Sequence, residues 1–146
     1  MPFDAINLSQ VRRVLVTKLR HHGDVLLASP VLSALKAAAP HVEVDALVYT
    51  DTAEMLDGHP DLSQLHCIDR GWKKLGLIGQ GTAEWALFTQ MKARQYDLLI
   101  HLTEHPRGAW LSRLLKPRYA VAPRVNGRGR FWKNSFTHFV SPIMGS

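Results

Sequence analysis

The sequence predicts an α/β fold, a Rossmann-like parallel sheet flanked by helices. Short runs of β-branched and other apolar residues alternate with longer stretches in which apolar residues recur at helical spacing. The first run, RRVLVTKL at residues 12–19, is nearly continuous in apolar residues, which is typical of a strand buried on both faces of a parallel sheet. Strands that alternate with helices form such sheets through crossover connections.

The composition is that of one globular domain with its own core, since 46% of the 146 residues are hydrophobic and 21% are charged. We expect residues 1–10 to form a tail and residues 123–146 to form a basic segment after the last strand. The single cysteine, Cys67, excludes a disulfide within the chain and fits a reducing, cytosolic compartment. No apolar run is long enough to span a bilayer, and MPFDAINLSQ lacks the pattern of a secretory signal.

The elements after the first strand follow from spacing and from Gly and Pro breaks. Apolar residues and alanines over 24–38 predict a helix, with Ser29-Pro30 as a second N-cap and first helical position. Pro40 ends that helix. The other predicted elements are strands at 42–48, 65–68, 97–102 and 118–122 and helices at 52–57 and 107–115.

One more helix is predicted after a loop. Glycines at 71, 76, 79 and 81 indicate that residues 71–81 form this loop. Thr82 then caps a helix that runs to about Arg94, with Glu84 in the first turn, where the helix dipole favours an anion. The buried side of this helix is expected to consist of Trp85, Leu87, Phe88 and Met91.

Positive charge is concentrated in the last third of the chain. Residues 1–100 hold ten Lys and Arg against eleven Asp and Glu, whereas residues 101–146 hold eight against one. Such a basic surface attracts phosphates, nucleic acid or an anionic membrane, and charge alone does not choose among them. The segment RVNGRGRFWK includes Arg124 and Arg128 and suits anion binding, although a solvated loop is the commoner fate of a charge run.

Ligands of open parallel sheets bind beyond the carboxyl ends of the strands, which selects the loops at 20–24, 49–53 and 103–107. In the first loop Asp24 lies at a helix start. It is either an N-cap carboxylate or a general base that faces a substrate hydroxyl. The two interpretations compete, because a carboxylate occupied in capping is a weaker base. In TEHPRGAW, Arg107 is either solvated beside a helix cap or part of a polar clamp on hydroxyls or a phosphate.

Several common sites are not predicted. The turn at 20–24 has one glycine, so it matches neither a dinucleotide fingerprint nor a Walker A loop. The eight histidines are scattered without the helical spacing of zinc ligands, and one cysteine does not make a zinc site of the usual kind. We therefore predict no metal and no cofactor.

The stretch VLVTKLRHHGDVLLASPVLSALKAAAPHVEVDALV resembles the opening of the ADP-heptose:lipopolysaccharide heptosyltransferases, glycosyltransferase family 9. The shared elements are a strand, a lysine, a short turn, Gly-Asp-Val, a helix with Ser-Pro, and a second strand. HPDLSQLHCID, RQYDLLIHLTEH and FWKNSFTHF extend the similarity and most resemble the heptosyltransferase III branch.

The resemblance implies the N-terminal half of a GT-B glycosyltransferase, whose two Rossmann-like domains face a cleft. This half holds the lipopolysaccharide-core acceptor, and the C-terminal donor domain, which holds ADP-heptose, is expected to be absent from residues 1–146. By this resemblance Asp24 is the proposed catalytic base and Lys18 lies near it. The expected acceptor-binding residues, several of them placed only by charge and location, are Lys18, Arg20, His22, Gly23, Arg107, Arg124 and Arg128.

The expected reaction is an inverting, metal-independent transfer of heptose from ADP-heptose to the inner core. We expect the chain by itself to be inactive, because half of the cleft is missing. The expected location is the cytoplasm, at the cytoplasmic face of the inner membrane, with peripheral contact to anionic lipid. The alternative is a non-enzymatic Rossmann-like module that binds an anionic ligand. A nucleic-acid binder is a third hypothesis, which the sequence does not favour because it contains no nucleic-acid motif.

Overall fold

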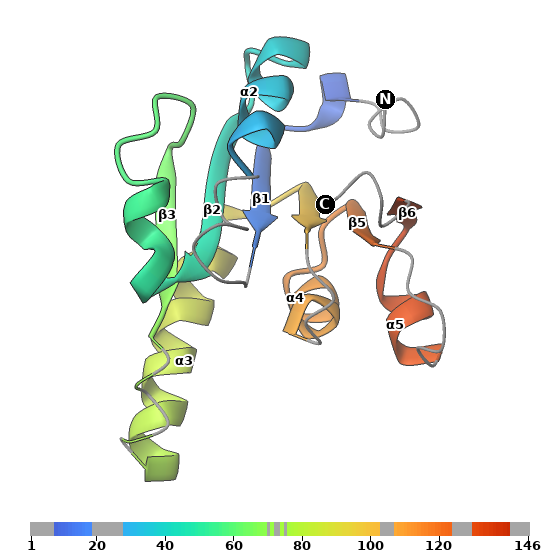
Figure 1. Cartoon of the computed structure of the whole chain (residues 1–146). Helices are drawn as coiled ribbons and strands as arrows, with labels where there is room; N and C mark the ends of the chain where they lie inside the picture. The colour runs from blue at the N-terminus through green and yellow to red at the C-terminus, as the bar shows by residue number, and fades with distance from the viewer. Residues whose placement is uncertain are drawn as a thin grey trace.

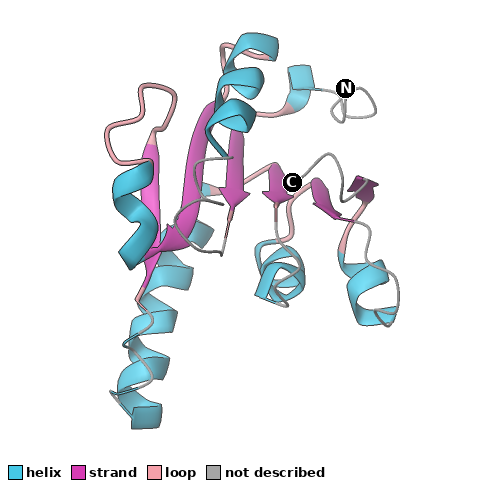
Figure 2. Ribbon diagram, viewed as in Figure 1, coloured by secondary structure: helices cyan, strands magenta, loops and turns pink. Residues whose placement is uncertain are grey.

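A computed structural model of the chain describes residues 8–18, 28–69, 71, 74, 76–102, 107–123 and 130–140. In this part of the chain six strands form one parallel sheet in the order β3-β2-β1-β4-β5-β6 (Figure 1, Figure 2). The strands are β1 (Arg13–Thr17), β2 (Glu43–Tyr49), β3 (Gln64–Ile68), β4 (Leu98–His101), β5 (Tyr119–Pro123) and β6 (His138–Val140). The helices are α2 (Ala28–Ala38), α3 (Gly76–Arg94), α4 (Arg107–Leu115) and α5 (Arg130–Ser135), with 3-10 turns η1 (Leu8–Gln10) and η2 (Thr50–Met55).

This strand order is that of the doubly wound α/β fold, so the predicted fold class is confirmed. The predicted strands and the helix at 107–115 appear with small shifts of their ends. The helix predicted at 52–57 is instead the 3-10 turn η2, two residues earlier. Ser29 and Pro30 lie inside helix α2 (Ala28–Ala38) rather than at a cap, and residues 24–27 of the predicted helix lie outside the described residues.

Two clusters of buried side chains cover the two faces of the sheet, because successive side chains of a strand point to opposite faces. One face packs Val14, Val16 and other strand residues against Leu32 and Leu35 of α2. The other face packs Leu15, Leu47 and Leu99 against α3, α4 and α5. The helices therefore divide between the faces, with α3, α4 and α5 together on one of them.

Helix α3 corrects the prediction for residues 71–94. It begins at Gly76, whose φ of 78° is in the left-handed region. Residues 76–81 of the predicted loop 71–81 are therefore helical. The Thr82 hydroxyl donates to the carbonyl of Ile78 inside the helix at 2.9 Å and caps nothing, and Glu84 lies in the third turn. Leu87 and Met91 are buried as predicted, whereas Trp85 is mostly exposed.

The basic segment expected after the last strand contains two further elements, α5 and β6. Strand β6 pairs with β5 in parallel, with Val121 beside His138 and Ala122 beside Phe139. Trp132 and Phe136 are buried in the core on the α3–α4–α5 face. The predicted fifth strand, β5, is therefore not the edge of the sheet, because the three-residue strand β6 pairs with it.

A buried ionic network lies at the amino-terminal edge of the sheet. The Asp45 side chain on β2 is fully buried and accepts hydrogen bonds from Arg94 Nε at 2.8 Å and from the Tyr96 hydroxyl at 2.6 Å. The Arg94 guanidinium also binds Glu43 at 2.8 Å, and His66 Nε2 lies 2.8 Å from the Tyr96 hydroxyl. This network fastens the end of α3 to β2 on the side of the sheet away from the predicted loops.

Candidate functional site at the carboxyl edge of the sheet

The position of the candidate site is indicated by the point in the sheet at which the order of the strands reverses. Strand β1 lies between β2 and β4, so its connection and that of β4 leave on opposite faces of the sheet. Ligands of doubly wound folds bind in the crevice outside the carboxyl ends of such strands. In this sheet the carboxyl ends of β1 and β4 mark that position, and the predicted loops 20–24 and 103–107 follow these two strands in the sequence.

Lys18 lies where β1 ends and is largely buried. Its Nζ donates to the carbonyl of Leu102 at 3.3 Å, and its backbone N–H donates to the carbonyl of Leu47 at 3.1 Å. Because a buried ammonium must be hydrogen-bonded, this lysine links the carboxyl end of β1 to that of β4. The structure therefore places the predicted Lys18 at the switch point.

His101, the last residue of β4, forms the base of this edge. Its ring is buried, its Nδ1 is hydrogen-bonded to the Thr17 hydroxyl, and it stacks on Phe136 with the two ring planes 3° apart. Gly108 of α4 passes directly over the ring, since a Cβ at that position would lie 2.1 Å from His101 Cδ2. A glycine here lets the first turn of α4 approach β4 closely, and it thereby fixes where that helix begins.

Arg107 is the first residue of α4 and forms an ion pair with Glu84 of α3, with Nη2 2.6 Å from Oε1. Both side chains are about one-third exposed, at 31% and 35%. Arg107 is thus ion-paired and partly exposed, and its role in binding stays a prediction. The guanidinium lies at the carboxyl edge of the sheet, as the prediction of a binding role requires.

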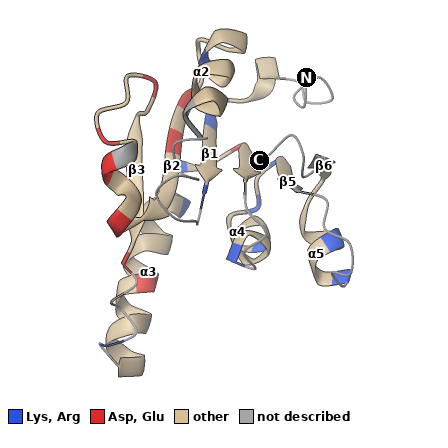
Figure 3. Cartoon of the chain, in the orientation of Figure 1, with Lys and Arg blue, Asp and Glu red and all other residues tan. Residues whose placement is uncertain are grey.

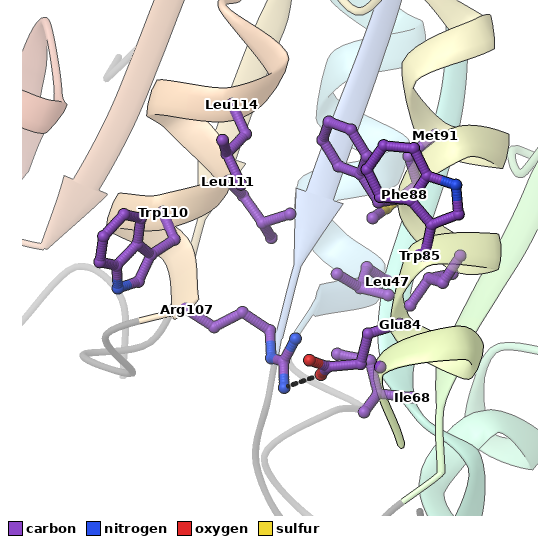
Figure 4. A pocket seen from close by; sticks show the side chains of 12 residues that line it. Leu47, Ile68, Glu84, Trp85, Phe88, Met91, Arg107, Trp110, Leu111 and Leu114 are labelled. Carbon is purple, nitrogen blue, oxygen red and sulfur yellow. Dashed lines mark ion pairs between the residues drawn. The ribbon is translucent and has the colours of Figure 1, made fainter. Parts of the chain in front are cut away.

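The ion pair closes one end of an apolar groove between α3 and α4 (Figure 4). The groove has a volume of about 330 Å³. Its floor includes Leu47 and Ile68 from the sheet, and its walls include Trp85 and Phe88 of α3 and Trp110, Leu111 and Leu114 of α4.

Two of the predicted site residues, Lys18 and Arg107, lie at the same edge of the sheet. The remaining six lie outside the described residues, so their predicted roles stay predictions. They are Asp24, Arg20, His22, Gly23, Arg124 and Arg128. Among the described residues, no three His, Cys, Asp or Glu side chains gather as a metal site would require.

The sequence prediction missed Glu84 as the partner of Arg107 and missed the groove. A signal was present, because Gly81, Trp85 and Phe88 recur at helical spacing, but the glycines made the first turns resemble a loop. It also missed the network around Asp45. A carboxylate within the apolar strand VEVDALV needs a buried partner, and this would have indicated one.

Comparison with solved structures defines the class of this domain. The chain matches the crystal structure of a family 9 glycosyl transferase from Veillonella parvula with a TM-score of 0.71 and 21% identity, over 88% of this chain and 35% of that one. It matches an E. coli heptosyltransferase solved with ADP-2-deoxy-2-fluoro heptose with a TM-score of 0.69 and 20% identity, over 88% and 42% of the two chains. The domain therefore has the α/β fold of glycosyltransferase family 9.

Comparison of sequences shows which members of this family the chain is similar to. The chain is 36% identical over 128 residues to lipopolysaccharide heptosyltransferase 3 of Escherichia coli, which covers 87% of this chain and 37% of that protein. It is 32% identical over 131 residues to lipopolysaccharide heptosyltransferase 1 of Pseudomonas aeruginosa, covering 85% of this chain and 37% of that protein. The predicted resemblance to the lipopolysaccharide heptosyltransferases is thus confirmed over most of the chain.

The chain spans about 37% of the length of these relatives. No family model matches it. None of the helices that the structure describes combines the length and the apolar character needed to cross a membrane.

Proposed function

We propose that this chain is the acceptor-binding half of a heptosyltransferase, which transfers heptose from ADP-heptose to the lipopolysaccharide inner core. The observation that supports this proposal most directly is the 36% identity to heptosyltransferase 3 over 87% of the chain. The cationic groups at the carboxyl edge of the sheet add support, because Lys18 and Arg107 lie at the ends of β1 and β4, where this fold binds ligands.

Asp24 is the proposed catalytic base. Asp24 follows Lys18 closely in the sequence, and its carboxylate is proposed to lie at the carboxyl edge of the sheet. The acceptor hydroxyl attacks the anomeric carbon of the heptose, the carboxylate takes the hydroxyl proton, and the bond from the anomeric carbon to ADP breaks. Attack from the side opposite ADP inverts the anomeric centre. General-base assistance of this kind contributes about 10²–10⁴-fold to a rate.

The acceptor is proposed to lie across the carboxyl edge. Arg107 at the start of α4, together with Arg20, His22 and Gly23 of the first loop, is proposed to contact its hydroxyls and phosphates. Arg124 and Arg128 follow β5 in the sequence and are proposed to add positive charge to the same edge. ADP-heptose is proposed to be held mainly by a part of the enzyme outside these 146 residues, without a metal ion.

The proposed location is the cytoplasm, with the protein resting on the cytoplasmic face of the inner membrane. The proposed acceptor is a lipid-linked saccharide, so the protein must work at a membrane surface. The strongly basic residues 101–146 favour contact with anionic lipid.

Titration calorimetry tests the proposal. A phosphorylated inner-core saccharide and ADP-heptose are titrated separately into the 146-residue chain. We expect measurable binding of the saccharide, weakened by an Arg107→Gln substitution, and little binding of ADP-heptose. Tight binding of ADP-heptose with none of the saccharide would assign this half of the cleft to the donor instead.

The base is tested in a protein of the relatives' length that contains this domain. Asp24→Ala is expected to lower turnover by about 10²–10⁴-fold while the saccharide still binds. Asp24→Asn is the matched variant, which keeps the shape of the side chain without the basic group. Near-normal turnover in either variant would refute the role of Asp24.

A further inference from the structure

The large apolar side chains that remain exposed lie on one face of the domain. Among the described residues there are six of them, and all six belong to α3, α4 or α5. Leu77 and Ile78 are 91% and 87% exposed, and Trp85 and Trp110 are 66% and 55% exposed. Leu114 and Phe131 complete the set. Monomeric soluble proteins rarely expose a contiguous apolar patch of more than a few hundred Å², so a face of this kind indicates an interaction surface.

These side chains join through the groove between α3 and α4. Trp85, Trp110 and Leu114 line it, and the ring of Trp110 lies 4.9 Å from that of Phe131 on α5. Leu77 lies one helical turn before Gly81, which also lines the groove. Figure 1 shows that α3 runs past the ends of the strands, so that its first turns stand clear of the sheet. The apolar surface thus continues from the tip of α3 to α5.

The same face is positively charged, and the opposite face is not. Figure 3 shows Lys and Arg on α4 and α5. The elements on the opposite face, α2 and η2, together carry Lys36 against Asp51 and Glu54. The helices α3, α4 and α5 carry Glu84 against Lys92, Arg107, Arg113, Arg130 and Lys133, while Arg94 pairs with Asp45 and Glu43 at the amino-terminal edge.

The cations lie beside exposed apolar side chains, an arrangement that fits a bilayer with an apolar interior and anionic headgroups. The Arg113 guanidinium lies 4.3 Å from the centre of the exposed Phe131 ring, and its Nε donates to the Ser135 hydroxyl at 2.8 Å, so a positive charge lies directly against the apolar surface. Tryptophan side chains beside such basic residues are characteristic of segments that lie in the headgroup region of a bilayer.

We propose that the face formed by α3, α4 and α5 docks on an anionic lipid bilayer. Leu77, Ile78, Trp85 and Trp110 enter the headgroup boundary, and Arg113, Arg130 and Lys133 contact lipid phosphates. This inference rests on the proposed function, in which the acceptor is a membrane lipid, and it names the surface that meets the membrane. The first turns of α3 extend beyond the carboxyl ends of the strands (Figure 1), so docking through them brings the carboxyl edge of the sheet towards the lipid surface.

Vesicle sedimentation tests the docking. The 146-residue chain is mixed with vesicles of phosphatidylglycerol and phosphatidylethanolamine, and separately with vesicles of phosphatidylcholine alone. We expect at least a tenfold higher partition coefficient on the anionic vesicles, which falls as salt is added. Emission from Trp85 and Trp110 is expected to shift to shorter wavelength on binding, and the variant Trp85→Phe/Trp110→Phe is expected to lose most of that shift.

Exposed residues provide variants that leave the fold intact. Arg130→Gln/Lys133→Gln is expected to lower the partition coefficient about 30-fold, because each basic residue near an anionic surface contributes about a fivefold factor. Leu77→Ser/Ile78→Ser is expected to lower it about tenfold or more. Arg12→Gln/Arg118→Gln is the matched control. It removes two exposed charges at the amino-terminal edge and is expected to leave vesicle binding unchanged.

Three outcomes would overturn the inference. They are equal binding to both kinds of vesicle, equal loss in the control variant, and self-association through this face without vesicle binding, which would identify a second copy of the chain as the occupant. The saccharide titration separates these outcomes from the proposed function. A chain that binds the soluble saccharide but no vesicle contradicts the docking surface alone. A chain that binds vesicles but no saccharide contradicts the acceptor role alone.

Discussion

Asp45 shows how the domain stabilises one buried charge. Burial by itself would raise the pKa of this carboxyl, but its interactions with His66, Arg94 and Tyr96 outweigh burial and lower the pKa to about 2. Burial raises the pKa of the Tyr96 hydroxyl, and the neighbouring Asp45 carboxylate raises this pKa further. The network is therefore a charged structural element whose members depend on one another.

Removing the carboxylate is expected to be costly. Asp45→Ala leaves the Arg94 guanidinium without its main buried partner, and we expect the free energy of unfolding to fall by about 3–5 kcal/mol. Glu43→Gln is the matched control, because Glu43 contacts the same arginine from an exposed position, and we expect a much smaller loss than at Asp45. Urea unfolding followed by circular dichroism measures both changes. A loss at Asp45 no larger than that at Glu43 would contradict the assignment.

The same group predicts a pH dependence. The folded-state pKa of Asp45 lies below its ordinary value of 3.8, so its contribution to stability is complete above pH 4 and is lost as the pH falls from about 4 to about 2. The size of this contribution is on the order of 2 kcal/mol. Unfolding free energies measured between pH 7 and pH 2.5 are expected to decline less steeply in Asp45→Asn than in the parent chain. Identical declines would show that Asp45 does not titrate in this range.

A Gly→Ala substitution is expected to change the free energy of unfolding in opposite directions at two positions. Gly108→Ala places a methyl group against the buried His101 ring, and we expect a loss of about 1–3 kcal/mol. Gly81→Ala, in an exposed turn of α3 with nothing within 4 Å of the new methyl group, is expected to stabilise by up to about 1 kcal/mol. Urea unfolding distinguishes the two signs.

The contact itself is tested by a second substitution. His101→Ala in the Gly108→Ala background is expected to remove the steric conflict, so the two substitutions should be strongly non-additive. Additive losses would mean that the Gly108 methyl group meets no resistance from the ring.

Helix α3 is the element in which the sequence was least informative. Its glycines lower helix propensity, and its stripe of Trp85, Leu87, Phe88 and Met91 was expected to be buried throughout. The structure buries Leu87 and Met91, and leaves Trp85 at the exposed side of the groove. Local spacing predicts which residues share a face of a helix, but the position of a neighbour such as α4 decides how much of that face is covered.

This difference along α3 has a measurable consequence. The first turns contain no buried side chain before Leu87, so they open more easily than the last turns, which pack on the sheet and on Asp45 through Arg94. We expect the amides of residues 80–84 to exchange with deuterium at least tenfold faster than those of residues 88–94, by nuclear magnetic resonance. Uniform protection along the helix would contradict this account.

Helix α5 and strand β6 could not be predicted for a related reason. A strand of three residues and a helix of six are too short for a periodic pattern, and their burial depends on partners such as Ala120, whose carbonyl accepts from the Thr137 N–H at 2.8 Å. In contrast, the strands of the central sheet are buried on both faces, so their composition alone indicates them.

At the scale of the molecule, the sequence predicts at which edge of the sheet the candidate site lies, but it predicts only some of the residues that form the site. The rule that ligands bind at the carboxyl ends of parallel strands selected the edge where Lys18 and Arg107 lie. Their actual partners, Leu102 and Glu84, depend on how β4 and α3 pack in space, which no spacing within the sequence encodes.

The charge of the molecule predicts how it responds to a polyanion. The basic helices form a short face with one ion pair in its groove rather than a long continuous track. We expect weak binding to random single-stranded DNA, which disappears between 50 mM and 200 mM salt, measured by fluorescence anisotropy. Binding that persists at the higher salt would revive the nucleic-acid hypothesis.

The buried Asp45 network lies at the edge of the sheet opposite the candidate site, so stability and ligand recognition depend on different edges. Cohesion depends on residues where the strands start, whereas recognition is expected where they finish. Variants of this chain can therefore be sorted by the edge of the sheet that they alter. Changes where the strands begin are expected to lower the melting temperature without altering ligand binding, and changes where the strands end are expected to alter ligand binding with little effect on the melting temperature.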